Sequence, residues 1–149
     1  GIYYWFPKIT GRKMSEALGK LHFWPSLIFM NGIFMPMFIQ GLAGVSRRMY
    51  DGGEIYAHAQ DVLQWNEFMS ISAFLLGAAQ VPFIINILIS IFNGEKADRN
   101  PWQATTIEWS APSPPVPHLN FEGDVEVYRG PYEYSVPDAE TDFIPQTEK

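Results

Sequence analysis

Two long apolar stretches, separated by polar segments, dominate the chain. They cover residues 21–45 and 68–93, and each contains a few polar side chains but no Asp, Glu, Lys or Arg. A helix rises about 1.5 Å per residue, so either stretch is long enough to cross the roughly 30 Å hydrocarbon layer of a bilayer. The pattern therefore predicts an all-α membrane protein with two transmembrane helices.

The segments outside these spans are predicted to be connectors and a tail. Residues 1–7 are rich in aromatic side chains and resemble the end of a preceding transmembrane helix, residues 8–20 form a connector, and residues 46–67 form a loop. Residues 94–149 form an irregular tail. Because the chain opens without Met and without a signal-peptide pattern, we expect further residues upstream.

Charge differs between the two short connectors. Residues 8–20 contain four Lys or Arg side chains and one Glu, whereas residues 46–67 contain two Arg and four acidic side chains. An excess of Lys and Arg in short loops marks the cytoplasmic side of a membrane. We therefore expect residues 8–20 and the tail on the cytoplasmic side, and residues 46–67 outside.

Prolines and side-chain amides interrupt both spans. A proline leaves a carbonyl one turn earlier without its helical partner, and an amide in hydrocarbon is costly unless it is paired. Such residues can serve local packing alone, or they can face a larger helix bundle, and we expect the second. The residues concerned are Pro25, Asn31, Pro36, Gln40, Gln80, Pro82 and Asn86. Small residues should allow close helix approach, among them Gly41, Gly44 and Gly77.

The tail has a different composition. Residues 103–149 contain nine acidic side chains and two basic ones, Arg129 and Lys149. The Pro-rich run at residues 111–117 predicts an extended spacer rather than a second core. Nothing in the chain is basic enough to favour nucleic acid, and the absence of Cys excludes disulfides and thiolate metal sites.

Arg47 and Arg48 are the strongest candidates for a binding site. They directly follow the first span and present two planar donor forks, which suit carboxylates. Because they are expected on the outer side, the preference for cytoplasmic Lys and Arg does not explain them. A specific anionic partner, a lipid headgroup and an ion pair with Asp51 all remain open.

The three histidines do not form a metal site by their spacing. His22, His58 and His118 lie in three separate regions, with neither an HxH nor an HxxxH pattern. We expect each to be structural or solvated, and His22 to contact a neighbouring helix. The segment by itself is predicted to hold no catalytic constellation.

Several short motifs, taken in order, resemble the last part of subunit I of the haem-copper cytochrome c oxidases. They are Trp5-Phe6-Pro7, Lys20-Leu21-His22-Phe23, Asn31 through Phe34 to Pro36, Gly41-Leu42-Ala43-Gly44, Ser46-Arg47-Arg48-Met49-Tyr50, Thr106-Ile107-Glu108-Trp109 and Pro112-Ser113-Pro114-Pro115. The resemblance covers residues 1 to about 122. Ser46 departs from the Pro that many members carry, and the loop between Tyr50 and Trp65 is longer.

The resemblance implies a place in a twelve-helix bundle that holds haem a and haem a3 with a copper ion. This chain would supply the end of the tenth helix, then the eleventh and twelfth. It implies that Arg47 and Arg48 bind haem propionates and that Phe34 lies near haem a. The iron and copper ligands would lie upstream of Gly1, so this segment would bind no metal directly.

The implied protein is the catalytic core subunit of a terminal oxidase. It would reduce O2 to water with electrons from cytochrome c and couple the reaction to proton translocation. Its partners would be the remaining helices of subunit I, other oxidase subunits, cytochrome c and the lipid bilayer, with a bacterial cytoplasmic membrane as the expected location. A quinol oxidase, a two-helix accessory or assembly subunit, and a transporter fragment are the alternatives.

Overall fold

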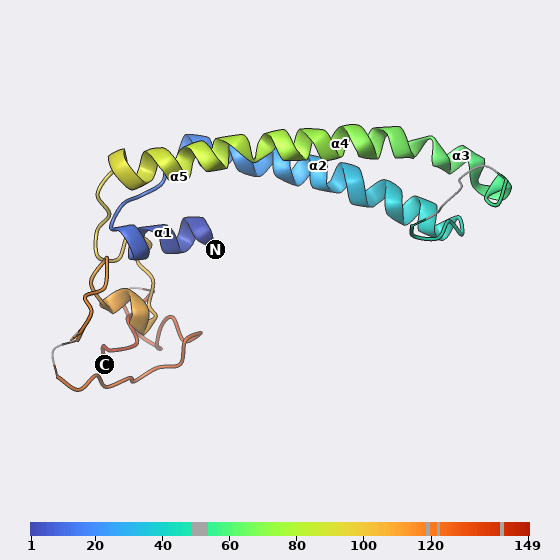
Figure 1. Cartoon of the computed structure of the whole chain (residues 1–149). Coiled ribbons are helices and arrows are strands. Elements are labelled where there is room, and N and C mark those ends of the chain that lie inside the picture. Colours follow the sequence, from blue (N-terminus) through green and yellow to red (C-terminus); the bar gives the residue numbers. More distant parts are fainter. Residues whose placement is uncertain (49–53, 119, 122, 141) are drawn as a thin grey trace. The chain divides into compact units, whose positions relative to one another are not determined.

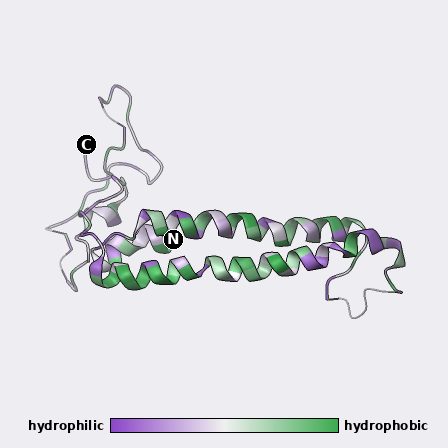
Figure 2. Ribbon diagram, turned by 90° about the horizontal axis from the view of Figure 1, so that it is seen from above, coloured by the Kyte–Doolittle hydropathy of each residue, from purple (hydrophilic) through white to green (hydrophobic). Residues whose placement is uncertain are grey.

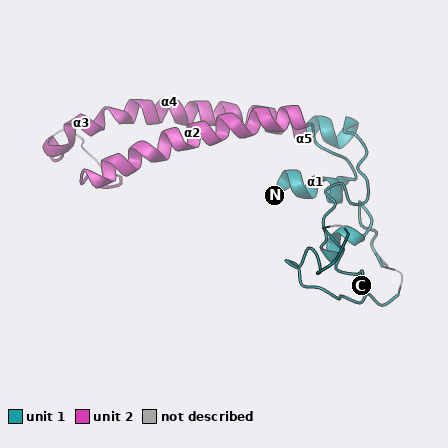
Figure 3. Ribbon diagram, turned by 180° about the vertical axis from the view of Figure 1, so that it is seen from behind, with its two compact units in different colours: residues 1–15, 87–149 teal, residues 16–86 magenta. Residues whose placement is uncertain are grey.

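The structure is a computed structural model that describes residues 1–48, 54–118, 120–121, 123–140 and 142–149. Within these ranges the regular elements are helices, and strand pairing is limited to one isolated bridge between Arg12 and Lys96. The chain divides into two compact units, Glu16–Asn86 and Gly1–Ser15 with Ile87–Lys149 (Figure 3). The predicted all-α class is confirmed.

The unit Glu16–Asn86, magenta in Figure 3, is a helical hairpin. Helix α2, Glu16–Leu42, lies side by side with α4, Trp65–Ala79, and the two run in opposite directions (Figure 1). Between them come the short 3-10 helix η1, Ala57–Ala59, and α3, Gln60–Leu63; α5, Val81–Asn93, continues beyond α4. Helix therefore begins before both apolar stretches, and in the first stretch it ends three residues before Val45.

Most of the surface of both long helices is not covered within the chain. Only 11% of the most apolar window of Glu16–Leu42 is buried, and 17% of that of Ala57–Asn93. The core helix of a water-soluble protein would be mostly buried. The green bands along the hairpin in Figure 2 are therefore surfaces suited to lipid or to further helices.

The seam between the two helices contains a close approach at Gly32 and Ser72. The buried or half-buried positions of the second arm recur every three or four residues, at Met69, Ser72, Leu76 and Ala79. A Cβ atom added to Gly32 of α2 would lie 2.7 Å from Ser72 Oγ and 3.2 Å from Ser72 Cβ. Such close backbone approach through small residues is how helices associate in a bilayer, where burial of apolar surface gives no net drive.

Pro82 explains the interruption between α4 and α5. Proline has no N–H and its ring clashes with the carbonyl four residues earlier, so the regular ladder breaks at Gln80. The backbone N–H of Gln80 bonds Gly77 O at 3.1 Å, and Ile84 N–H restarts the ladder on Gln80 O at 3.1 Å. By contrast, α2 continues through Pro25 and Pro36 as one element.

The other unit, teal in Figure 3, contains α1, Ile2–Thr10, the last residues of α5, and the tail with the 3-10 helix η2, Ile107–Ser110. Its centre is aromatic. Trp109 is 1% exposed; its ring stacks on Trp5 with centroids 5.6 Å apart and meets the edge of Tyr4 at 5.1 Å. Trp102 stacks on Tyr4 and donates from Nε1 to the Tyr4 carbonyl at 3.0 Å. The tail is thus packed on α1 through its tryptophans.

Candidate functional site

A glycine turn ends α2 and places the arginine pair beyond it. Gly44 has φ 85°, a left-handed conformation that favours glycine. Val45 N–H bonds Gln40 O at 3.0 Å and Gly44 N–H bonds Gly41 O at 3.1 Å, which is the hydrogen-bond pattern of a Schellman motif. A Cβ on Gly44 would also lie 3.3 Å from His58 Nε2. The chain therefore turns sharply just before Arg47 and Arg48.

Both arginines are exposed and their guanidiniums are unengaged within the described part of the chain. Neither forms a hydrogen bond or ion pair with a described residue, and Arg48 itself has φ 57°. Asp51, one of the partners considered from the sequence, lies outside the described residues. Two guanidinium forks without a partner in the described part of the chain are suited to bind a carboxylate-bearing ligand.

The loop that carries the arginines is closed by a side-chain hydrogen bond. Ser46 Oγ and Tyr56 OH lie 2.5 Å apart, and the rings of Tyr56 and His58 have centroids 6.1 Å apart. The Ser46 hydroxyl thus joins the end of the turn after α2 to the residue that precedes η1. Sequence reasoning did not identify Tyr56 as this partner.

Phe34 faces away from the hairpin seam. Its side chain is 51% exposed, and Phe38, one turn later, is 69% exposed. Residues four apart lie on the same face of a helix. The two rings therefore form an aromatic surface on α2 that is available to a group outside this hairpin.

The side-chain amides of α2 are satisfied within the chain. Gln40 is 7% exposed; its Nε2 donates to Asn66 Oδ1 at 2.9 Å and to the Val62 carbonyl at 3.0 Å. Asn31 instead bonds the Leu27 carbonyl of its own helix at 2.8 Å and stays exposed. Gln40 therefore finds its partners within the hairpin, whereas the sequence led us to expect them in a larger helix bundle.

A second polar cluster lies at the Pro82 interruption. Gln80 Oε1 is 3.1 Å from His22 Nε2, and Gln80 Nε2 donates to Ser26 Oγ at 3.1 Å and to the Leu76 carbonyl at 3.0 Å. The His22 ring stacks on Phe83 at 4.9 Å. A groove of about 530 Å³ is bordered by His22, Ser26 and Gln80. The predicted contact of His22 with a neighbouring helix is confirmed.

The histidines do not come together with other ligands. His58 lies in η1, His118 is exposed in the tail, and His22 contacts Gln80. Among the described residues, no group of three His, Asp or Glu side chains is placed to hold a metal ion.

Lys8 fastens the tail to α1 in the other unit. The side chain is 7% exposed, and Nζ donates to the Ala111 carbonyl at 2.8 Å while it lies 4.9 Å from the centre of the Trp109 ring. Burial lowers the pKa of Lys8, nearby Arg99 lowers it further, and Glu108 opposes both. The undocked tail therefore binds more protons than the docked tail at pH values between the lowered pKa and 10.5.

We expect tail docking to strengthen as the pH rises through that window. The gain is at most ~1.4 kcal/mol per pH unit, because one proton is involved. Hydrogen exchange of residues 105–112 in the intact protein, corrected for intrinsic rates between pH 7 and 10, measures it. Lys8→Met should abolish the slope. A slope of opposite sign, or one that persists unchanged in Lys8→Met, would show that Lys8 does not control docking.

The family model and the similar proteins point to the same family. Residues 1–76 match the model of the family described as cytochrome c and quinol oxidase polypeptide I. The chain is 43% identical over 148 residues to alternative cytochrome c oxidase subunit 1 of Bradyrhizobium diazoefficiens, covering 99% of this chain and 25% of that protein. It is 44% identical over 136 residues to cytochrome c oxidase subunit 1 of Synechocystis, covering 91% and 23%.

A less similar relative is also named as an oxidase subunit. The haem-copper oxidase subunit I+III of Aeropyrum pernix is 37% identical over 126 residues, covering 83% of this chain and 14% of that protein. The chain spans a quarter or less of the length of these three relatives. With a family match over half its length and two membrane-length helices, the chain belongs to the cytochrome c and quinol oxidase polypeptide I family.

Proposed function

We propose that this chain is a C-terminal portion of the catalytic core subunit of a haem-copper cytochrome c oxidase. The complex reduces O2 to water with electrons from cytochrome c and translocates protons. The observation that supports this most is the arginine pair at the turn after α2, in a chain 43% identical to a cytochrome c oxidase subunit 1 over nearly its whole length. The two uncovered helices fit an integral membrane protein that packs against further helices.

Within that proposal, Arg47 and Arg48 hold the propionates of haem a and haem a3. Their unengaged guanidiniums offer charge and paired donors, and carboxylates at the edge of a low-dielectric layer need both to stay ionised. Phe34 lies beside haem a and presents an apolar aromatic face. The haems and the copper supply the redox chemistry when bound, and their metal ligands come from outside residues 1–149.

The topology follows from the same proposal. The loop at residues 46–67 lies on the outer side of a bacterial cytoplasmic membrane, and residues 8–20 and 94–149 lie on the cytoplasmic side. Residues 1–7, proposed as the end of a preceding transmembrane helix, fall largely within α1, and the proposed spans at residues 21–45 and 68–93 fall largely on α2 and on α4 with α5. The other oxidase subunits and the remaining helices cover the exposed faces of the hairpin.

A quinol donor is the alternative, because the matching family model includes both kinds of oxidase. The donor is tested on the purified membrane complex that contains this chain, by oxygen uptake with reduced cytochrome c or with a short-chain quinol. We expect uptake with cytochrome c and little with quinol. Uptake with quinol alone would establish the alternative, and a complex that contains this chain but no haem would indicate an accessory subunit.

A further inference from the structure

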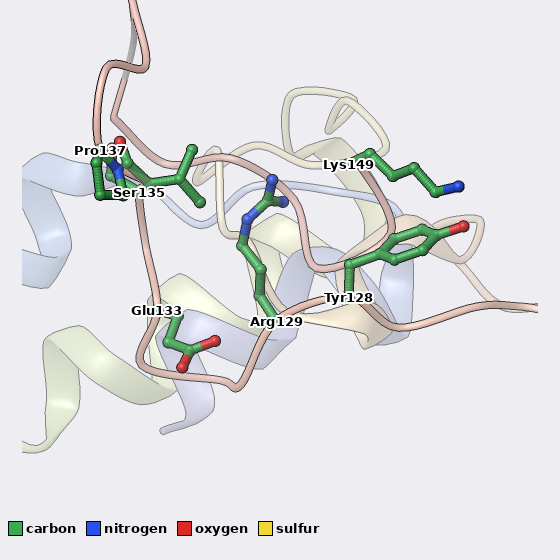
Figure 4. A pocket seen from close by; sticks show the side chains of 7 residues that line it. Tyr128, Arg129, Glu133, Ser135, Pro137 and Lys149 are labelled. Atoms are coloured by element: carbon green, nitrogen blue, oxygen red, sulfur yellow. Dashed lines mark hydrogen bonds between the residues drawn. The ribbon is translucent and has the colours of Figure 1, made fainter.

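The two basic side chains of the acidic tail lie at one cavity. Residues 103–149 contain nine acidic side chains, and their only basic residues are Arg129 and Lys149. Both line a cavity of about 510 Å³ within the tail, shown in Figure 4. Both residues therefore bring positive charge to the border of this cavity, and Figure 4 shows the Lys149 side chain extending away from the Arg129 guanidinium.

Arg129 is buried without a counter-charge. The residue is 8% exposed, and its Nη1 donates to the carbonyls of Pro145, at 3.0 Å, and Glu148. Its Nε has no hydrogen-bond partner, and the guanidinium forms no ion pair with any residue in the described part of the chain. A buried charge is normally paired, because its desolvation is otherwise uncompensated.

The position of Arg129 is fixed by its neighbours. Gln146 is 7% exposed; its Nε2 donates to the Arg129 carbonyl at 2.9 Å, and its Oε1 accepts from the Ile107 N–H at 3.0 Å. The backbone N–H of Tyr128 also bonds the Gln146 carbonyl at 2.9 Å. The guanidinium therefore projects from a segment tied to η2, rather than from a free loop.

Two other charged residues, Lys149 and Glu133, line the cavity. Lys149 Nζ lies 5.1 Å from the centre of the Tyr128 ring, and the Tyr128 hydroxyl is engaged by Glu126. The Glu133 carboxylate accepts from the Gly130 N–H at 2.7 Å, and Figure 4 shows it directed away from the guanidinium.

We propose that this cavity binds a phosphate group, either free phosphate or the phosphate of a small ester. Two cations match the charge of a phosphate monoester, about −1.5 to −2 at pH 7, better than that of a single carboxylate. A planar guanidinium suits phosphate oxygens, and an ammonium adds a point charge. The cavity is within the size range of small-molecule sites, so an ester has room beside the phosphate. This proposal is independent of the haem role of Arg47 and Arg48.

The test uses the purified, delipidated complex that contains the full chain, in detergent and a zwitterionic buffer of low ionic strength. Inorganic phosphate is titrated and the heat of binding is measured. Arg129→Gln should weaken binding by about 10- to 100-fold, as expected for charge-assisted hydrogen bonds, and Lys149→Gln by about fivefold. Lys149→Gln guards against misfolding of Arg129→Gln, because the Lys149 side chain makes no hydrogen bond in the described part of the chain.

Two further variants fix the sign of the effect. Glu133→Gln keeps an acceptor for the Gly130 N–H but removes a negative charge from the wall, so phosphate should bind more tightly. Lys96→Gln removes an exposed positive charge that does not line this cavity, and should leave binding unchanged. Equal affinity in the parent, Lys149→Gln and Glu133→Gln proteins would overturn the proposal, as would an equal loss in Lys96→Gln.

The source of the phosphate group is a separate question. The same titration with glycerol 3-phosphate and with a short-chain phosphatidic acid distinguishes a soluble ester from a lipid headgroup. Binding of either that depends on Lys149 supports the phosphate site and assigns its source. Binding of both without dependence on Lys149 or Arg129 would contradict the site.

Discussion

Replacing Arg47 by Met in the assembled oxidase is expected to lower the midpoint potential of the haem whose propionate it holds. A positive charge near the iron favours the reduced, less positive state, so its removal favours the oxidised state. The loss of one charge-assisted contact corresponds to a shift on the order of 60 mV for a one-electron couple. A spectroscopic redox titration of the purified variant measures the shift.

The matched control is Lys20→Met. Lys20 also carries one positive charge on the hairpin, but it lies in the first turns of α2 and pairs with Glu16 at 2.8 Å. An exposed pair of this kind contributes little. We expect its titration to match the parent. If Arg47→Met and Lys20→Met both titrate like the parent while haem content is intact, Arg47 does not hold a propionate.

Replacing Gly32 by Leu should have the largest effect on stability. A Cβ at this position would already lie 2.7 Å from Ser72 Oγ and 3.2 Å from Ser72 Cβ. A longer side chain would increase this steric overlap. Overpacking of a tight interface costs about 1–3 kcal/mol or more. We expect the assembled protein to lose stability or to fail to assemble, as measured by thermal unfolding in detergent and by haem retained after purification.

Gly32→Ala provides the graded version of this experiment. The single methyl should destabilise by about 1 kcal/mol, because the Ser72 hydroxyl must move. Adding Ser72→Ala removes the 2.7 Å contact but leaves the 3.2 Å one, so the double variant should recover part of the loss. A Gly32→Ala protein as stable as the parent, with no coupling to Ser72→Ala, would show that the helices do not approach closely here.

The helices themselves could be predicted from the sequence because their signal is strong. Apolar runs of this length without charge have few alternatives, and the structure contains both. The end of the first helix was less predictable. Val45 continues the apolar run, yet the helix stops at Leu42 because Gly44 adopts a left-handed conformation, which hydrophobicity does not encode.

Close approach within the hairpin involves a glycine that the sequence pattern did not single out. Gly41 and Gly77 have the expected spacing, but a Cβ on either would meet nothing within 4 Å among the described residues. Gly32 makes the approach instead. Which glycine faces a partner depends on the relative rotation of the two helices, and one sequence without its partner helices does not determine that rotation.

The candidate site was partly predictable in the same way. The sequence shows an adjacent arginine pair after an apolar run, and in the structure both residues are exposed beyond the turn. The bond between Ser46 and Tyr56 was not visible, because it joins residues ten apart through the fold of a loop. The burial of Arg129 was also missed, since a lone Arg in an acidic tail ordinarily indicates a solvated side chain.

The central claim is that Arg47 and Arg48, at the turn after α2, bind the propionates of haem. A density map of the intact complex that contains this chain measures this directly. We expect guanidinium nitrogens of Arg47 and Arg48 about 2.7–2.9 Å from propionate oxygens. Guanidiniums directed to water or lipid, with no porphyrin carboxylate in reach, would contradict the account.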